Sequence, residues 1–254
     1  MWAADWKDTS YWLDGLPQVA GVSSDLKRKV DVLIIGSGYT GLNAALEIAR
    51  GGRDVMVIES GHPGFGCSTR NGGQISTHVK PSLEKLTQKV GASKASAMRR
   101  EGVNALDWIE ELVNKEKLDC NFIRAGRFHA AHSREQYDDL ARDAEKLTNF
   151  ENIPTEIVPK AEQHKELGTD IYHGGVVFPR HASVHPAKYH HGLLSRVIEA
   201  GATVVSYCEA KAVNKLEKGF EVRTSRGDVV CKDLVVATNG CLLYTSDAAD
   251  ERLR

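Results

Sequence analysis

The sequence has 254 residues, and its balance of 41% hydrophobic and 26% charged residues is that of a soluble globular protein. The formal net charge of −1 excludes a bulk field that would favour nucleic acid or an anionic membrane. No apolar run is long enough to span a bilayer, the N-terminus lacks the order of a secretory signal, and the five cysteines form no C-x-x-C pair. We therefore expect a cytoplasmic protein without a membrane span, a disulfide framework or a metal site.

The first part of the chain predicts a β-turn-α-β unit. An aromatic leader, 1–29, precedes a strand at 30–36, a helix at about 39–50 and a second strand at 54–60. Because both strands are apolar on both faces, they indicate a parallel sheet covered by helices. A long helix is expected near 92–116, where apolar side chains recur at helical spacing.

The pattern changes in the middle of the chain. Residues 120–133 are typical of an extended strand, 134–148 of a charged helix, and 170–179 of a second β stretch with a glycine break. We interpret 119–182 as an inserted second domain of α+β type.

The last part returns to alternating helix and strand. Pro186 suits the first position of a helix, which we expect over 187–200, and "ATVVSY" follows as a strand. Residues 211–232 predict a β meander with "SRGD" as a turn, and "LVVAT" predicts a further buried strand. The fold class expected is α/β: a Rossmann-like domain, with a parallel sheet, helices and a β meander, interrupted by the inserted domain.

The motif "GSGYTG" follows the first strand and opens the first helix. Its glycines, Gly36, Gly38 and Gly41, have the G-x-G-x-x-G spacing that permits a tight turn, the approach of a pyrophosphate and close helix–strand packing. Glu59 ends the next strand, where a carboxylate can accept hydrogen bonds from ribose hydroxyls. The combination predicts dinucleotide binding, and the acidic residue argues against the 2′-phosphate of NADP.

A second glycine-rich stretch, "GFGCSTRNGGQIS" (64–76), follows the second strand almost at once. A nicotinamide dinucleotide needs no second loop of this kind, whereas a flavin dinucleotide needs backbone that approaches its long ring system. The alternative is a flexible surface loop in which Arg70 is merely solvated. We favour the flavin because the loop lies where the first motif would deliver a ligand.

These motifs resemble a known family. "DVLIIGSGYTGLNAALEIARGGRDVMVIES" followed by "GFGCSTRNGGQ" is similar to the FAD-dependent D-amino acid oxidase/glycine oxidase (DAO) superfamily, with the strongest likeness to its γ-glutamylputrescine oxidoreductase branch. "TSYWLDGLP", "HASVHPAKYHHGLL" and "VVATNG" fit the same pattern, so the resemblance covers about residues 9–240.

The resemblance implies an FAD-binding flavoprotein and a set of cofactor contacts. The glycine turn would hold the pyrophosphate region, Glu59 the ribose, the second loop the flavin and its phosphates, and the backbone of Val213 the adenine. The turn after the last strand would close over the dinucleotide. The implied set is Gly36, Gly38, Tyr39, Thr40, Gly41, Glu59, Ser68, Arg70, Asn71, Gly72, Gly73, Gln74, Val213, Ala237, Thr238, Asn239 and Gly240.

Two kinds of residue stay open at this point. Cys67 departs from the alanine common in the family, so a covalent flavin link competes with the role of a small buried side chain. His78 could face the flavin ring or act as a packed or capping histidine. His190 and His191 are adjacent on a helix and form no i, i+4 metal pair. No catalytic residue is assigned.

The reaction implied by the resemblance is oxidation of a small amine or amino acid at a C–N bond, by hydride transfer to flavin and hydrolysis of the imine. No nucleic acid or membrane partner is expected, and the oligomeric state is left open. Two other functions remain as alternatives. One is an NAD-linked dehydrogenase, against which the second loop counts, and the other is a non-catalytic nucleotide-binding fragment.

The resemblance also implies a domain plan. It comprises an N-terminal extension (1–29), an FAD-binding domain (30–118 and 183–240) and a partial substrate-binding domain (119–182). Family members continue beyond the "ATNG" turn, whereas "CLLYTSDAADE" is what one reading frame of a common transposase library adapter encodes. We therefore hypothesise that 241–254 is a non-native tail and that the chain is an N-terminal fragment. A genuine divergent C-terminus is the alternative.

Overall fold

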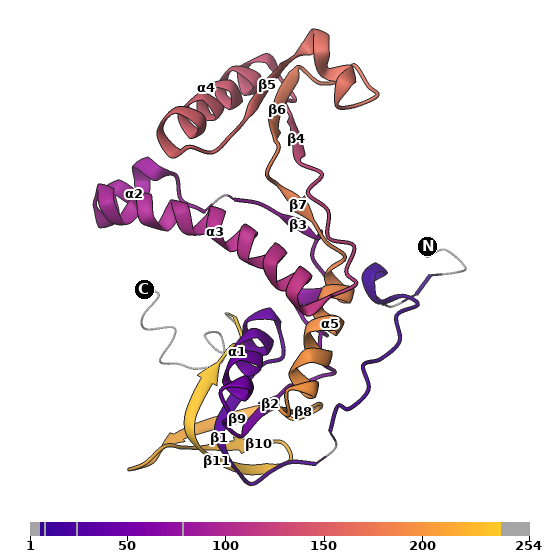
Figure 1. Ribbon diagram of the computed structural model, residues 1–254, viewed down its shortest axis with the longest axis vertical. Coiled ribbons are helices and arrows are strands. Elements are labelled where there is room, and N and C mark those ends of the chain that lie inside the picture. The colour runs from indigo at the N-terminus through magenta and orange to yellow at the C-terminus, as the bar shows by residue number, and fades with distance from the viewer. Residues whose placement is uncertain (1–5, 8, 24, 78, 240–254) are drawn as a thin grey trace. The chain divides into compact units, whose positions relative to one another are not determined.

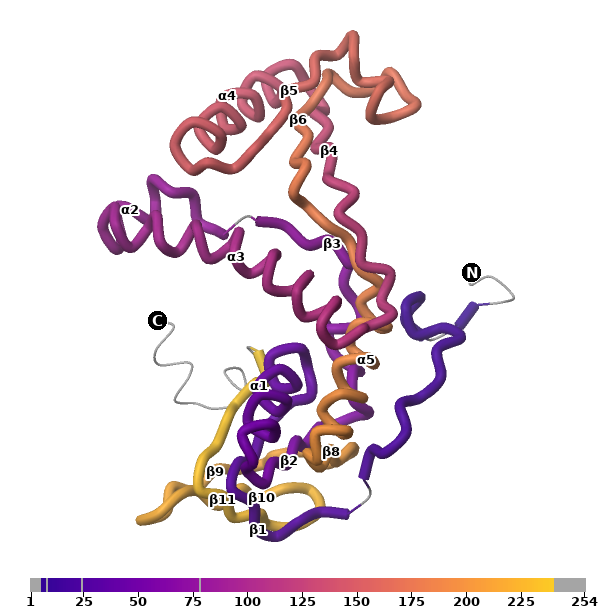
Figure 2. The backbone as a smooth tube through the Cα atoms, in the orientation of Figure 1, coloured from indigo at the N-terminus to yellow at the C-terminus, as the bar shows by residue number. Residues whose placement is uncertain are grey.

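The computed structural model describes residues 6–7, 9–23, 25–77 and 79–239. The chain forms two compact units. Figures 1 and 2 show the backbone coloured by residue number, from the N-terminus to the C-terminus. Unit 1 comprises 1–72, 118–120 and 186–254, and unit 2 comprises 73–117 and 121–185. Gly240, the tail 241–254 and His78 lie outside the described residues.

Unit 1 is built on one six-stranded sheet, in the order β8-β2-β1-β11-β10-β9. The strands β8, β2, β1 and β11 run parallel, and β10 and β9 continue the sheet as an antiparallel meander. Its elements are β1 (Lys29–Ile35), α1 (Tyr39–Arg50), β2 (Val55–Ile58), α5 (Pro186–Glu199), β8 (Thr203–Val205), β9 (Ala210–Lys215), β10 (Phe220–Thr224) and β11 (Gly227–Val236), with short 3-10 turns at Tyr11–Leu13 and Cys67–Thr69.

Strands β1 and β2 are buried on both faces, as their composition predicts. Alternate residues of a strand point to opposite faces, so β1 contributes to two cores. Val32 and Ile34 pack in a cluster with side chains of α1 and α5, such as Leu46 and Leu193. Leu33 packs on the opposite face, in a cluster that includes side chains of the meander. The predicted α/β class and its parallel sheet are confirmed.

The end of the meander differs from the prediction. The segment "LVVAT" (234–238) is not a separate buried strand: its first three residues are the end of the ten-residue strand β11, and Ala237 and Thr238 follow that strand. The whole of β1 pairs with β11 in parallel, from Lys29↔Val230 to Ile35↔Val236, while the first half of β11 also pairs with β10. The last residue, Val236, is 52% exposed. The sequence pattern missed this because no turn residue marks where the pairing with β10 ends.

Among its described residues, unit 2 contains three α-helices and two small antiparallel sheets, in the orders β4-β6-β5 and β3-β7. The predicted long helix is confirmed as α3, which Figure 1 labels together with α4. Helix α4 extends three residues beyond its expected end. The elements are β3 (Gln74–Ile75), α2 (Leu83–Val90), α3 (Ala92–Glu116), β4 (Arg127–Ala130), α4 (Arg134–Glu151), β5 (Glu156–Pro159), a 3-10 helix at Lys160–Lys165, β6 (Gly174–Phe178) and β7 (Ala182–Ser183).

The predicted extended strand at 120–133 is mostly irregular. Only Arg127–Ala130 forms a strand, although Ile123 makes an isolated bridge to Ser183. The chain turns into α4 directly afterwards, because the Ser133 hydroxyl accepts the N–H of Gln136 at 3.1 Å and so caps the helix.

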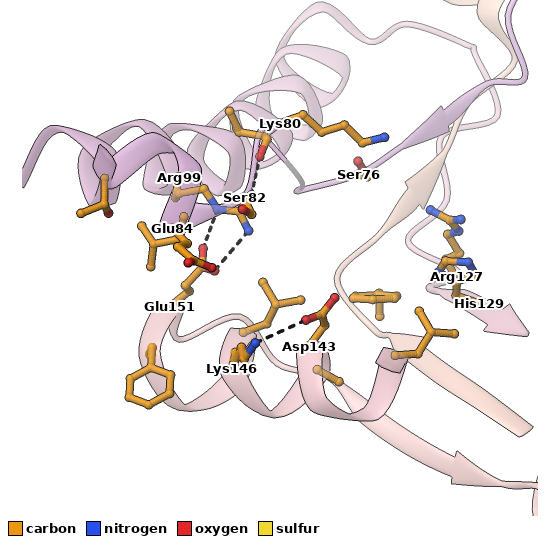
Figure 3. A pocket seen from close by; sticks show the side chains of 18 of the residues that line it. Ser76, Lys80, Ser82, Glu84, Arg99, Arg127, His129, Asp143, Lys146 and Glu151 are labelled. Carbon is orange, nitrogen blue, oxygen red and sulfur yellow. Dashed lines mark hydrogen bonds and ion pairs between the residues drawn. The ribbon is translucent and has the colours of Figure 1, made fainter. Parts of the chain in front are cut away.

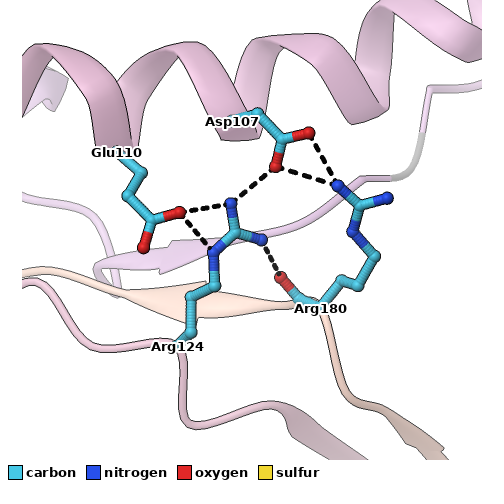
Figure 4. A network of polar contacts seen from close by, with 4 residues as sticks. All are labelled: Asp107, Glu110, Arg124 and Arg180. Carbon is cyan, nitrogen blue, oxygen red and sulfur yellow. Dashed lines mark hydrogen bonds and ion pairs between the residues drawn. The ribbon is translucent and has the colours of Figure 1, made fainter.

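The boundary of unit 2 differs from the expected one, since this unit also takes in 73–117. A charged network ties α3 to the chain that follows it (Figure 4): Arg124 donates to Asp107 and Glu110 at 2.6 Å, and Arg180 donates to Asp107. Burial opposes ionisation of Asp107, but the two guanidinium groups hold its pKa below the ordinary value. Helical periodicity shows that α3 is a helix but not which unit it packs in.

A candidate dinucleotide-binding site

The glycine turn joins β1 to α1 in unit 1, and two of its glycines are required by the chain itself. Gly36 has φ +104°, and a Cβ there would lie 2.7 Å from the carbonyl oxygen of Ala237. A Cβ on Gly41 would lie 2.0 Å from the carbonyl oxygen of Gly36. Gly38 differs, because its nearest neighbour is only the Ser68 hydroxyl at 3.0 Å. The first and third glycines therefore have the turn and packing roles that their spacing predicts.

Helix α1 begins directly after this turn. Its first intrahelical bond runs from the Leu42 N–H to the carbonyl of Gly38, so the N–H groups of residues 39–41, in the first turn, have no partner within the helix. The Tyr39 N–H donates to Ser68 Oγ at 3.2 Å, and this contact brings the second glycine-rich loop to the helix start. Thr40 lies in the same first turn. Amide groups and the positive end of the helix dipole suit a phosphate here.

Glu59 follows β2 and is bound to the glycine turn. The Ser37 N–H and hydroxyl donate to Glu59 Oε2 at 2.9 and 2.8 Å. The hydroxyl of Ser60 and the N–H of Gly61 donate to Oε1 at 3.1 and 3.4 Å. Burial opposes ionisation of Glu59, but the donors of these three residues hold its pKa below the ordinary value. The site therefore carries a fixed negative charge beside the turn at neutral pH.

The end of β11 completes the neighbourhood of the turn. The Ala237 N–H donates to the carbonyl of Ile35 at 2.8 Å, which places the following residues beside Gly36. The Thr238 hydroxyl is buried and has no hydrogen-bond partner among the described residues. Asn239 has a left-handed backbone, with φ +57°. A buried hydroxyl without a partner next to the glycine turn fits a ligand with polar groups, as a dinucleotide has.

Two polar side chains of the second loop, Arg70 and Asn71, make contacts within the loop itself. The Arg70 guanidinium lies over the Phe65 ring, 4.2 Å from its centroid. The Asn71 amide donates to the carbonyls of Cys67 and Ser68, both at 3.1 Å. The thiol of Cys67 is free. A Cβ on Gly72 would meet nothing within 4 Å, so that glycine is not required by packing within the described chain.

Three predicted site residues lie elsewhere. Gly73 and Gln74 belong to unit 2, where the Gly73 carbonyl accepts the N–H of Val184 and Gln74 pairs with Ser183 across β3 and β7. Val213 lies on β9, the edge strand of the meander, and is 44% exposed. The structure therefore groups Gly36, Gly38, Tyr39, Thr40, Gly41, Glu59, Ser68, Ala237, Thr238 and Asn239 around the turn and leaves Val213 on another strand.

Two residues of the turn's surroundings were missed by the sequence analysis. Ser37 and His190 are both fully buried, and His190 Nε2 lies 2.8 Å from the carbonyl oxygen of Ser37. Helical periodicity would have found His190, because it falls on the same face of α5 as the buried residues Leu193, Leu194 and Val197.

Two tyrosines pack beside this histidine. The Tyr39 and Tyr189 rings meet edge to face, with centroids 5.1 Å apart. The Tyr39 hydroxyl donates to the carbonyl of Pro186 at 3.1 Å. Burial raises the pKa of both phenols to about 12, so both remain protonated and neutral at physiological pH.

Unit 2 contains a large cavity, about 1280 Å³, between α2, α3, α4 and the strands β4 and β6. Figure 3 shows Arg99 paired with Glu151 on one side, and Arg127 and His129 on the other. Burial, with a smaller effect from Arg127, lowers the pKa of His129. None of the residues that are both described and predicted to bind the cofactor lines this cavity. None of the described helices is long and apolar enough to cross a membrane.

The chain matches a family model and several known proteins. A family model described as "FAD dependent oxidoreductase" (DAO) matches residues 31–252. "Probable oxidoreductase OrdL" of Haemophilus influenzae is 30% identical over 82% of this chain and 48% of its own length. "Gamma-glutamylputrescine oxidoreductase" of Escherichia coli is 28% identical over 88% of this chain and 51% of its own. The family match runs past Gly240, where the sequence analysis expected the resemblance to stop.

Solved structures of two other proteins show the same fold. The crystal structure of glycine oxidase from Geobacillus kaustophilus superposes with a TM-score of 0.69 at 22% identity, over 83% of this chain and 55% of that one. L-amino acid deaminase from Proteus vulgaris superposes with a TM-score of 0.71 at 20% identity, over 87% and 50%. The chain thus spans about half the length of the curated relatives it matches.

Proposed function

Because the chain belongs to the DAO family of FAD dependent oxidoreductases, we propose that it carries the FAD-binding part of an enzyme that oxidises a small amine or amino acid at a C–N bond. The observation that carries the proposal is the junction of three features in unit 1. These are the tight turn at Gly36, the N-terminus of α1 and the ionised Glu59 at the end of the adjacent parallel strand.

In this proposal the pyrophosphate of FAD lies against the first turn of α1, where Gly38 leaves room for its approach. The Glu59 carboxylate accepts hydrogen bonds from the ribose hydroxyls. One of its four present donors, the Ser60 hydroxyl, is on an exposed side chain and can be exchanged for a ribose hydroxyl. The Thr238 hydroxyl supplies a further polar contact from the end of β11.

The chemistry would come from the cofactor. Bound FAD would accept a hydride from the carbon beside the substrate nitrogen, while that nitrogen loses a proton, and water would hydrolyse the imine so formed. The substrate class proposed is a γ-glutamylputrescine-like amine or an amino acid. It is supported by the similarity to a relative named for γ-glutamylputrescine. We propose that unit 2 supplies part of the substrate-binding domain.

A titration of FAD into the 254-residue chain tests the proposal. We expect bound flavin with quenched fluorescence, and anaerobic bleaching of its visible absorbance by an amine or amino acid substrate. Glu59→Gln removes the charge but keeps an acceptor, so we expect FAD to bind about 10-fold more weakly. Glu47→Gln, on the exposed face of α1, is the matched control and should bind as the wild type does.

Three other outcomes separate the alternatives. FAD that binds but is bleached by no amine would favour a non-catalytic flavin-binding chain. NAD retained in place of FAD would sink the proposal and favour an NAD-linked dehydrogenase. Equal affinities for FAD in Glu59→Gln and the wild type would remove Glu59 from the ribose site.

A further inference from the structure

His190 is a fully buried imidazole in α5 that the proposed cofactor contacts do not use. Its Nε2 lies 2.8 Å from the carbonyl oxygen of Ser37, the residue between the first two glycines of the turn. Since a carbonyl only accepts, Nε2 must carry the hydrogen. The other ring nitrogen, Nδ1, is buried with no hydrogen-bond partner among the described residues. The ring is therefore a neutral donor that makes a single hydrogen bond.

Ser37 links His190 to the carboxylate of Glu59. Its N–H and hydroxyl both donate to Glu59 Oε2, while its carbonyl accepts from His190. The N–H, the hydroxyl and the carbonyl of this buried serine are thus all hydrogen-bonded. One short chain of hydrogen bonds joins α5, the glycine turn and the end of β2, and it holds the peptide between Gly36 and Gly38 in one orientation.

The same ring also shapes the start of the second loop. A Cβ on Gly64 would lie 2.9 Å from both Cε1 and Nδ1 of His190, so only a glycine can approach the imidazole there. The Thr69 hydroxyl donates to the carbonyl of Gly64 from the other end of the loop. Both glycine-rich segments therefore rest on one imidazole, the first through a hydrogen bond and the second through van der Waals contact.

We propose that His190 is the positioning residue of the dinucleotide site: as an Nε2–H donor to Ser37 it holds the glycine turn, and through it Glu59, in the conformation that accepts FAD. The inference rests on the proposed function for the identity of the ligand. A side chain of similar size without a donor would leave the buried Ser37 carbonyl without its partner, and the turn would be free to reorient.

Two substitutions in the full chain test this role. His190→Leu keeps the bulk and removes the donor, and we expect FAD to bind about 10-fold more weakly or worse. His190→Gln can place an N–H near the position of Nε2, so we expect affinity within about 3-fold of the wild type. His191→Leu, the half-buried neighbour, is the control and should retain wild-type affinity. Dissociation constants come from flavin fluorescence quenching, and far-UV circular dichroism checks folding.

The role is overturned if a folded His190→Leu binds FAD as the wild type does, or if His190→Gln is weakened as much as His190→Leu. A second measurement covers a leucine variant that does not fold. In ¹⁵N-labelled wild-type protein at pH 7, His190 should give the signals of a neutral Nε2–H tautomer, assigned by their absence in His190→Gln. A charged ring or an Nδ1–H tautomer overturns the inference whether or not FAD binds. Failure of the wild type to bind FAD, with the expected tautomer present, would instead overturn the proposed function.

Discussion

The glycine turn of unit 1 and the cavity of unit 2 differ in the kind of polar groups they contain and in whether those groups are paired. Around the turn, the polar groups are backbone amides, hydroxyls and one carboxylate, and the Thr238 hydroxyl has no hydrogen-bond partner within the part of the chain that the structure describes. In the wall of the cavity, Arg99 is 8% exposed and Glu151 10%, and each neutralises the other. The turn therefore presents polar groups that a ligand could engage, whereas the buried charges in the wall of the cavity are paired with each other.

The largest effect should come from the turn itself. Gly41→Ala would place a Cβ 2.0 Å from the backbone oxygen of Gly36, so α1 and the turn must move apart. We expect a loss of about 4 kcal/mol or more in the free energy of unfolding, together with loss of FAD binding. Urea titration measures the first and fluorescence quenching the second.

Gly66→Ala is the matched control for this substitution. A Cβ at that position would meet nothing within 4 Å, so its free energy of unfolding should stay within about 0.5 kcal/mol of the wild type. If Gly41→Ala changes the free energy of unfolding as little as Gly66→Ala does, close helix–turn packing does not constrain the site.

The buried ion pair of unit 2 should give the next largest effect. In Arg99→Met the Glu151 carboxylate loses the guanidinium that donates to it at 2.5 Å, and the Val79 carbonyl also loses a donor. We expect a destabilisation of about 3 kcal/mol, because one charge stays buried without its partner. The double variant Arg99→Met/Glu151→Leu should recover much of this loss. If it is as unstable as the single variant, the pair is not the cause.

Acid should weaken unit 1 through His190. Burial is the main cause that lowers its pKa to about 4, with contributions of either sign from Ser37, His191, Glu59 and His62. Below its ordinary value near 6.5 the unfolded chain takes up a proton that the folded chain does not, so stability falls as pH falls from 6.5 toward 4.

At pH 5 this linkage should cost about 2 kcal/mol, measured as the change in unfolding free energy relative to pH 7. His190→Gln has no imidazole to protonate, so its stability should fall less over the same interval. If the unfolding free energies of the wild type and His190→Gln fall equally over this pH interval, His190 is not buried in a neutral state.

The smallest effect should come from the partly exposed network of Figure 4. Asp107 is 39% exposed at its side chain and Arg180 36%, so solvent screens their ion pair. We expect Arg180→Met to cost less than about 1 kcal/mol, and the difference from wild type to shrink in 1 M salt. A loss as large as that of Arg99→Met would place this network with the buried pair rather than with the surface.

Much of the fold follows from short-range patterns. Helices α1 and α3 have the bounds that periodicity and glycines predict, and the strand, turn and helix around Gly36 follow from one motif. The pattern did not reveal α2, a short helix of eight residues, or the continuity of β11. The continuity of β11 depends on its pairing with β1, which is distant in sequence, whereas α2 is followed directly by α3.

The candidate site divides in the same way. Local sequence was sufficient to predict the glycine turn, the helix start and the acidic residue after the second strand, because a strand–turn–helix unit places these groups by its own geometry. The pairing of His190 with Ser37, of Ala237 with Gly36 and of Arg99 with Glu151 joins residues 153, 201 and 52 positions apart. Such contacts are set by the packing of whole elements, which no local spacing encodes, so only the tertiary structure assigns a role to His190.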